Sequence, residues 1–196
     1  MTDFPLFPLP SVLFPHGRMP LQVFERRYLD LVRDSLRAGT GFGVVWLRSG
    51  AEVARPGEAE PQLGDCGTVA RIVDWDQLPS GLLGVTVQGG VRFELHDARR
   101  RDDGLMVGDI TVEPPLETVP MQLDWATLEE VLRSLETHPH VQRMGISIDY
   151  GDAWQVGCWL AQLLPLEESV KYELLACPDI DALMRELDII LNRISD

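Results

Sequence analysis

The chain has 196 residues, 45% of them hydrophobic, and a net charge of −14. This length is enough for one sizeable core or two small ones. The negative charge argues against nucleic acid and anionic membrane surfaces as partners, because both bind basic surfaces. No apolar run approaches the roughly 20 residues of a membrane-spanning helix. The N-terminus lacks the basic start of a secretory signal, and three scattered cysteines do not indicate a disulfide framework or a zinc ribbon. We therefore expect a cytoplasmic protein.

The first forty residues predict extended chain followed by a helix. Prolines recur through residues 5–15, which excludes a helix there and favours an edge strand. Residues 16–18 form a predicted turn, and residues 19–24 a second short strand. From Glu25 the apolar residues recur at helical spacing, and Gly39 is the expected end of the helix. The face predicted to be apolar consists of Phe24, Tyr28, Leu31, Val32 and Leu36.

Residues 42–113 predict a series of short strands joined by turns. The expected strands are residues 42–47, 67–75, 82–87, 91–95 and 105–112, and residues 49–64 are a predicted surface loop rich in Gly, Pro and Glu. With the two N-terminal segments this makes six or seven strands and one helix. A small sheet of this kind leaves exposed edges unless it bends, so we expect a pseudo-barrel.

The remaining residues predict four amphipathic helices with short connections, typical of a four-helix bundle. Their expected ranges are 124–138, 152–164, 166–176 and 179–194, with aspartates at the helix starts as caps. The predicted fold class is therefore α+β, with a β-rich subdomain over residues 1–118 and a helical subdomain over 119–196. Residues 1–112 carry a net charge of −3 and residues 113–196 one of −11. A solvated helical surface explains this difference, and an acidic face for basic partners is the alternative.

Several blocks of the sequence resemble one known family. The N-terminal blocks are Leu6-Phe7-Pro8-Leu9, Val12-Leu13-Phe14-Pro15, Met19-Pro20-Leu21 and Phe24-Glu25-Arg26-Arg27-Tyr28. Two later blocks are Gly67-Thr68-Val69-Ala70-Arg71-Ile72 and Gly89-Gly90-Val91-Arg92-Phe93. In order and spacing they resemble the N-terminal, substrate-recognition domain of Lon proteases over residues 5–115, and the helical part resembles it less closely. One departure is His16, inserted between Pro15 and Gly17, which concerns the shape of that loop.

The resemblance implies binding of polypeptides, either unfolded segments or partner proteins. It also implies a stand-alone member without the ATPase and protease modules of Lon proteases. The sequence agrees, because it has no phosphate-loop motif, and Lys171 is its only lysine. A Ser169–Lys171 dyad is unfavourable, since residues two apart on a helix do not face each other. We expect no enzymatic activity and no cofactor. The alternatives are a hydrolase with an unrecognised active site and an adaptor that docks on a protease through its acidic helices.

Candidate site residues cluster in the first block. The loop of residues 14–19 is an expected surface segment, and its tentative protein-binding residues are Phe14, His16, Arg18 and Met19. The alternative is that Phe14 and Met19 fill the end of the barrel. Glu25 and Tyr28 are predicted to be structural, with the Glu25 carboxylate accepting backbone N–H groups of this loop or of the helix's first turn.

Neither a metal site nor a catalytic pair is expected. His138 and His140 are too few to hold a metal ion and lie where a helix should end. No local motif pairs a cysteine with a histidine as a nucleophile and base. The sequence does not indicate an oligomeric state.

Overall fold

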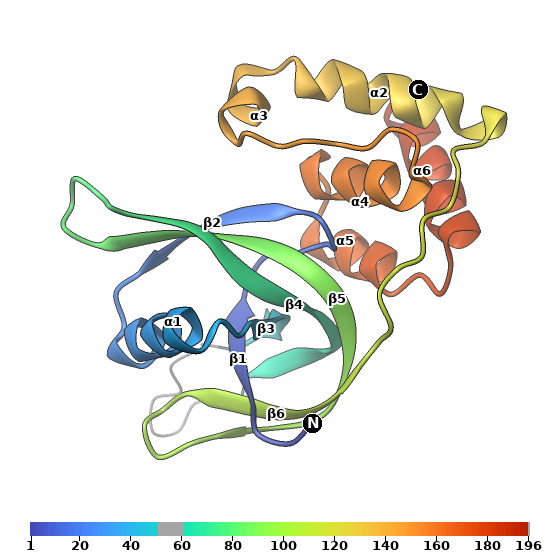
Figure 1. Cartoon of the computed structure of the whole chain (residues 1–196). Helices are drawn as coiled ribbons and strands as arrows, with labels where there is room; N and C mark the ends of the chain where they lie inside the picture. The colour runs from blue at the N-terminus through green and yellow to red at the C-terminus, as the bar shows by residue number, and fades with distance from the viewer. Residues whose placement is uncertain (51–60, 196) are drawn as a thin grey trace. The chain divides into compact units, whose positions relative to one another are not determined.

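The computed structural model describes residues 1–50 and 61–195. Most of the predicted surface loop, residues 49–64, lies outside these ranges. The chain divides into two compact units, residues 1–115 and 116–196. The sequence analysis placed the division between residues 118 and 119. Each unit is described by itself below (Figure 1).

The first unit is a mixed structure of six strands and one helix. The strands are β1 (Phe4–Leu9), β2 (Arg18–Val23), β3 (Phe42–Ser49), β4 (Gln62–Gln77), β5 (Leu83–Arg100) and β6 (Met106–Val112), and the helix is α1 (Arg26–Ala38). Two predicted strands, residues 82–87 and 91–95, are one continuous strand. The predicted turn at Gln88–Gly90 is absent because β4 pairs with β5 on both sides of it.

The sheet has the strand order β2-β5-β4-β3-β1-β6, and β5 also pairs with β6. This is possible because β5 is long enough for two partners on one edge. Its first part, from Leu83, pairs with β2, and its second part, from Phe93, pairs with β6. Only β1 and β3 run parallel to each other. β2 has a pairing partner on one edge alone, so its other edge carries backbone groups that no described strand engages.

Helix α1 packs its apolar face against the sheet of its own unit (Figure 1). Tyr28, Leu31 and Val32 are buried with Phe7 and other strand residues, and the Phe7 and Tyr28 rings stack with centroids 3.9 Å apart. Gly39 ends the helix with a positive φ of 64°, as predicted. Two residues assigned to the apolar face are nevertheless exposed, Phe24 to 67% and Leu36 to 48%. The buried stripe is therefore narrower than the periodicity predicted.

The second unit is helical throughout its regular elements. Its helices are a 3-10 turn η1 (Leu123–Trp125), α2 (Ala126–Glu136), α3 (Pro139–Arg143), α4 (Ala153–Leu163), α5 (Glu168–Leu175) and α6 (Ile180–Ser195). The prediction of four helices missed α3, because Pro139 was taken as the end of a helix and instead stands at the start of one, where proline is favoured. No helix among residues 1–50 and 61–195 is long and apolar enough to cross a membrane.

The predicted aspartate caps have different outcomes. Asp152 caps α4 by accepting a hydrogen bond from the Trp154 N–H, and Asp179 accepts one from the Ala182 N–H. Both agree with the prediction. Asp124 does not cap a helix, since it lies inside η1 and α2 begins after Trp125 with no side-chain cap.

Candidate functional site

The loop that the sequence singled out is packed tightly against β5. The Phe14 ring is 1% exposed. His16 has a positive φ of 64° and donates its backbone N–H to the Gly89 carbonyl at 2.9 Å. Gly89 in turn donates to the Gly17 carbonyl at 2.9 Å. The extra residue His16 is therefore accommodated in a left-handed position, where glycine or asparagine is more usual.

Arg18 and Met19 open strand β2 and are half-buried. Met19 pairs with Val87 and packs against the core cluster that contains α1. The burial of Phe14 and the packing of Met19 favour the alternative in which these side chains fill the interior of the unit. A protein-binding role for the loop stays a prediction.

Glu25 and Tyr28 stand at the strand-to-helix junction. The Glu25 carboxylate lies 2.9 Å from the Arg27 guanidinium and makes no side-chain cap to the helix. Arg27 is the more deeply buried partner, donates to the Gly104 carbonyl at 2.8 Å, and lies over the Tyr28 ring at 4.6 Å. The carboxylate thus acts through a side chain and not through the backbone N–H groups of the first turn.

A surface that the sequence analysis did not single out lies along β2. A hollow of about 230 Å³ borders the strand beside β1. Its lining is mostly apolar and includes Phe7, Leu9, Leu21 and Tyr28, and the 67% exposed Phe24 stands at it. Because β2 has no second strand partner, this hollow lies next to an available strand edge.

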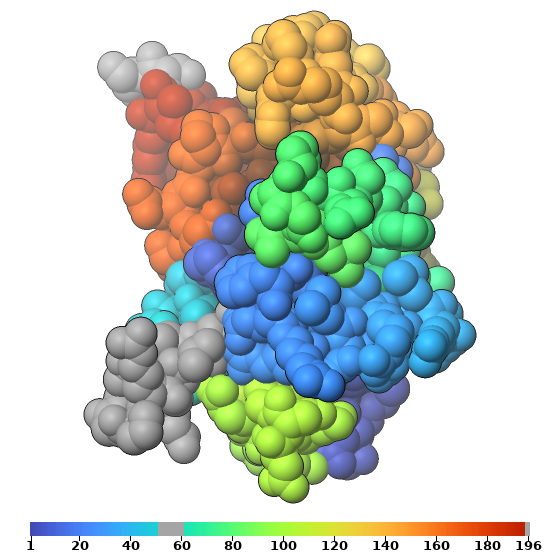
Figure 2. All heavy atoms as spheres, turned by 90° about the vertical axis from the view of Figure 1, so that its left-hand side faces the viewer, coloured from blue at the N-terminus to red at the C-terminus, as the bar shows by residue number. Residues whose placement is uncertain are grey.

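A second hollow of about 250 Å³ lies between β2 and the β4–β5 hairpin. Pro20, Leu21 and Gln22 line both hollows, so the two are continuous along β2. The hairpin contributes Trp75, which is 62% exposed, between Asp74 and Asp76. Figure 2 shows the tip of this hairpin, in green, directly beside the blue residues of β2 and the start of α1. We call the two hollows together the β2 groove.

The sequence contained a signal for Trp75 that the analysis assigned to the core. Trp75 lies between two aspartates near the end of a strand that is longer than the core requires. From Val73 to Gln77 every residue of β4 is exposed, because the hairpin extends beyond the residues that pack inside the unit. A tryptophan flanked by carboxylates at a strand end is therefore better read as a surface residue.

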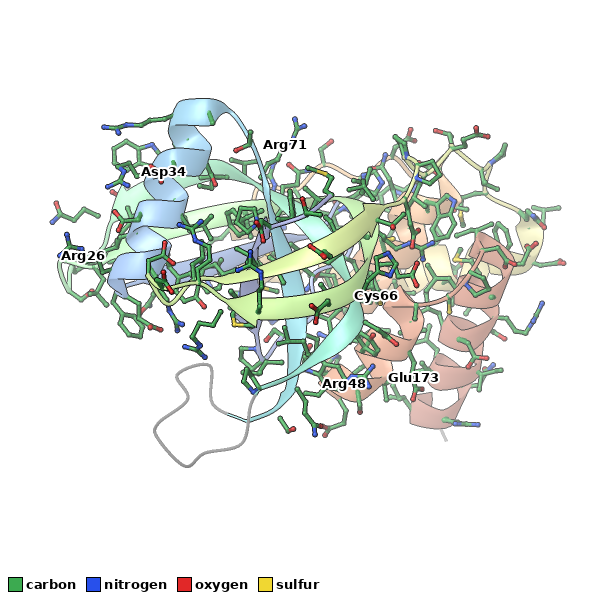
Figure 3. The ribbon with its side chains drawn as sticks, turned by 90° about the horizontal axis from the view of Figure 1, so that it is seen from below. Arg26, Asp34, Arg48, Cys66, Arg71 and Glu173 are labelled. Carbon is green, nitrogen blue, oxygen red and sulfur yellow. The ribbon has the colours of Figure 1, made fainter. Side chains whose placement is uncertain are left out.

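The groove lacks the features of a catalytic centre. It is lined mostly by apolar side chains, with Asp74, Asp76 and Glu25 as its acidic groups. The shifted pKa values lie elsewhere: hydrogen bonding to Arg33 lowers the pKa of the exposed Asp34 carboxyl, and burial with a bond to Glu136 raises the pKa of Tyr150. Asp34 lies on the exposed side of α1 (Figure 3).

Metal ligands do not gather in the described residues, where no group of three His, Cys, Asp or Glu side chains fits an ion. His138 instead accepts a hydrogen bond from the His140 backbone N–H, as a residue at a helix start does. Lys171 is buried, donates to the Gln162 carbonyl at 3.2 Å and lies 3.7 Å from Glu168.

Comparison with known proteins decides the family. The model of the ATP-dependent protease La (LON) substrate-binding domain matches residues 3–193, almost the whole chain. The chain belongs to the LON substrate-binding domain family. A solved structure described as a Lon N-terminal domain protein from Xanthomonas campestris is 35% identical, with a TM-score of 0.72 and 98% of each chain covered.

Other members of the LON family are more distant or longer. The N-terminal domain of a Mycobacterium avium complex Lon protease shares the fold, with a TM-score of 0.62 at 14% identity over 94% of this chain and 95% of that one. Lon protease 2 of Myxococcus xanthus is 39% identical, and Lon protease of Anaeromyxobacter dehalogenans 38% identical, each over 92 residues. The match covers 46% of this chain and only 11% of either protease.

Proposed function

We propose that this chain is a non-catalytic module that binds polypeptide segments and acts in substrate recognition or as an adaptor. The observation that carries the proposal is the β2 groove, with two exposed aromatic side chains beside an available strand edge, in a member of a substrate-binding family. We further propose that the ligands are unfolded segments or partner proteins, with no role for nucleic acid or membrane.

The groove offers two kinds of contact to a polypeptide. Phe24 and Trp75 present apolar surface that loses water when a ligand side chain covers it. The available edge of β2 offers backbone groups for pairing with an extended segment. Pro20 interrupts this edge because proline has no N–H to donate. We therefore expect side-chain contacts to supply most of the affinity and main-chain pairing to be short.

The alternative, a hydrolase, has less support. General acid–base or nucleophilic catalysis requires converging polar groups of shifted pKa in a deep pocket. The β2 groove is shallow and apolar instead. Cys66, Cys158 and Cys177 form no disulfide in the described structure, which fits the proposed location in the reducing cytoplasm.

The proposal is tested by measuring binding of a fluorescently labelled, reduced and carboxymethylated polypeptide to the intact chain. We expect Phe24→Asp and Trp75→Asp each to weaken binding about tenfold, because each places a charge where apolar surface is buried. Both residues are largely exposed, so the melting temperature should change little. Leu36→Asp is the matched control, an exposed apolar residue of α1 that does not line the groove.

Met19→Asp tests the loop of residues 14–19 separately. If Met19 serves the core, this substitution lowers the melting temperature strongly, because an unpaired charge is buried. A folded Met19→Asp protein with weakened binding would instead support the loop as a contact surface. Undiminished binding by both the Phe24 and the Trp75 variants would reject the β2 groove as the site.

A further inference from the structure

The helical unit carries a groove that the proposed function does not use. It lies between α5 and α6 and encloses about 690 Å³. Along α6 its lining residues Ile190 and Ile194 are one turn apart, and along α5 so are Val170 and Leu174. The two apolar rows therefore face the same hollow over about two helical turns.

These apolar side chains are only partly covered. Ile194 is 61% exposed, and Ile190 and Val170 are half-buried, whereas Leu174 is buried at the groove floor. Single exposed apolar residues are ordinary on protein surfaces. An aligned pair of apolar rows that flanks a hollow is instead typical of a surface that receives a third helix.

The charges around the groove point to the chemistry of the occupant. Glu167, Glu173 and Glu186 line it and are exposed, and none forms an ion pair within the part of the chain described. Glu173 projects from the helical unit in Figure 3. Arg193 is the one basic residue of the lining. The neighbouring Glu168, which is not in the lining, pairs with the chain's single lysine.

We propose that the α5–α6 groove docks an amphipathic helix of a partner protein whose apolar stripe is flanked by lysine or arginine. The stripe would fill the space between the two apolar rows, and the basic side chains would pair with the three glutamates. A second copy of this chain is disfavoured as the occupant through its own helical unit, because residues 113–196 carry a net charge of −11.

The test uses the intact chain and a labelled synthetic helix of about 14 residues, with leucines one turn apart and lysines on both flanks. Fluorescence anisotropy should show saturable binding that weakens as salt is raised. A peptide with glutamate in place of each lysine should not bind, and neither should one with alanine in place of each leucine. Equal binding of the glutamate peptide would overturn the proposal, as would failure of the lysine peptide to bind.

Two variants place the peptide in the groove. Ile194→Asp and the triple variant Glu167→Lys, Glu173→Lys, Glu186→Lys should each weaken binding about tenfold, the latter because three exposed charge pairs contribute up to about 1 kcal/mol each. The charge-matched control is Glu117→Lys, Asp124→Lys, Glu130→Lys, which changes net charge equally at exposed positions outside the groove. Equal weakening by this control, or no weakening by the groove variants, would overturn the proposal.

Self-association and the β2 groove are distinguished in the same experiments. A concentration-dependent dimer that Ile194→Asp converts to a monomer would overturn the proposal in favour of a second copy as occupant. The groove variants should leave binding of unfolded polypeptide unchanged, and Phe24→Asp should leave binding of the lysine peptide unchanged. Loss of helix binding on Phe24→Asp would show that the peptide occupies the β2 groove and would reject the α5–α6 site.

Discussion

Gly89 shows how one residue fixes the loop before β2. A Cβ at this position would lie 2.1 Å from the Phe14 carbonyl oxygen, a backbone atom that cannot move aside without displacing the loop. The same residue exchanges backbone hydrogen bonds with His16 and Gly17. Only glycine permits this close approach of two backbone segments. The constraint explains why the loop is held in place despite its prolines.

We therefore expect Gly89→Ala to lower the free energy of unfolding by about 3 kcal/mol, the upper range for overpacking. Urea denaturation followed by tryptophan fluorescence measures the change. Gly90→Ala is the matched control, since its nearest contact is the Val69 carbonyl at 3.2 Å, and it should cost clearly less. An equal loss in the two variants would show that the contact with Phe14 is not the cause.

The pair Glu25–Arg27 supports a second prediction at this scale. Arg27 is almost fully buried, and Glu25 neutralises its charge at 2.9 Å. We expect Glu25→Ala to destabilise the protein by about 1–3 kcal/mol, because it leaves a buried guanidinium without its carboxylate. Asp30→Ala removes an exposed ion pair with Arg33 and should cost less than about 1 kcal/mol. Thermal melting of both variants measures the difference, and identical midpoints would contradict the assigned role.

At the scale of elements, Asp152 joins helix α4 to the segment before η1. Its carboxylate accepts hydrogen bonds from the N–H groups of Trp154 at 3.1 Å and Val119 at 3.3 Å, and its backbone pairs with Pro120. Asp152→Ala should cost about 2 kcal/mol, the upper range for loss of a cap. Asp152→Asn keeps an acceptor oxygen and should retain most of the stability. Chemical denaturation of the two variants checks this order, which a purely electrostatic role would reverse into equal losses.

The elements differ in how far the sequence predicted them. Helix α1 was predictable because Tyr28, Leu31 and Val32 repeat at helical spacing and Gly39 ends the helix. The continuity of β5 through Gly89 and Gly90 was not, because two adjacent glycines indicate a turn unless a long partner strand holds them extended. Helix α3 was missed since Pro139 is equally compatible with ending one helix and beginning the next.

The candidate site was less accessible to sequence reasoning than the fold. Phe14 and Met19 belong to the blocks that carry the family resemblance, yet they are wholly or partly buried, so those blocks largely record packing. Phe24 lies in such a block but is exposed, because it falls between the end of β2 and the start of α1. The exposure of Trp75 depends on how far the β4–β5 hairpin extends beyond the core, which is a property of tertiary structure.

At the scale of the whole molecule, catalytic activity is the property that most sharply separates this chain from the proteases it resembles. ATP hydrolysis on a phosphate loop requires a lysine at the phosphates, and a serine–lysine dyad requires another. The only lysine, Lys171, is buried and hydrogen-bonded to the Gln162 carbonyl. We therefore expect that a protein of these 196 residues neither hydrolyses ATP nor cleaves casein. Phosphate release and cleavage of labelled casein measure this, with Lys171→Met as the control for contamination. Turnover that survives purification and disappears in that variant would show that the chain carries an active site of its own.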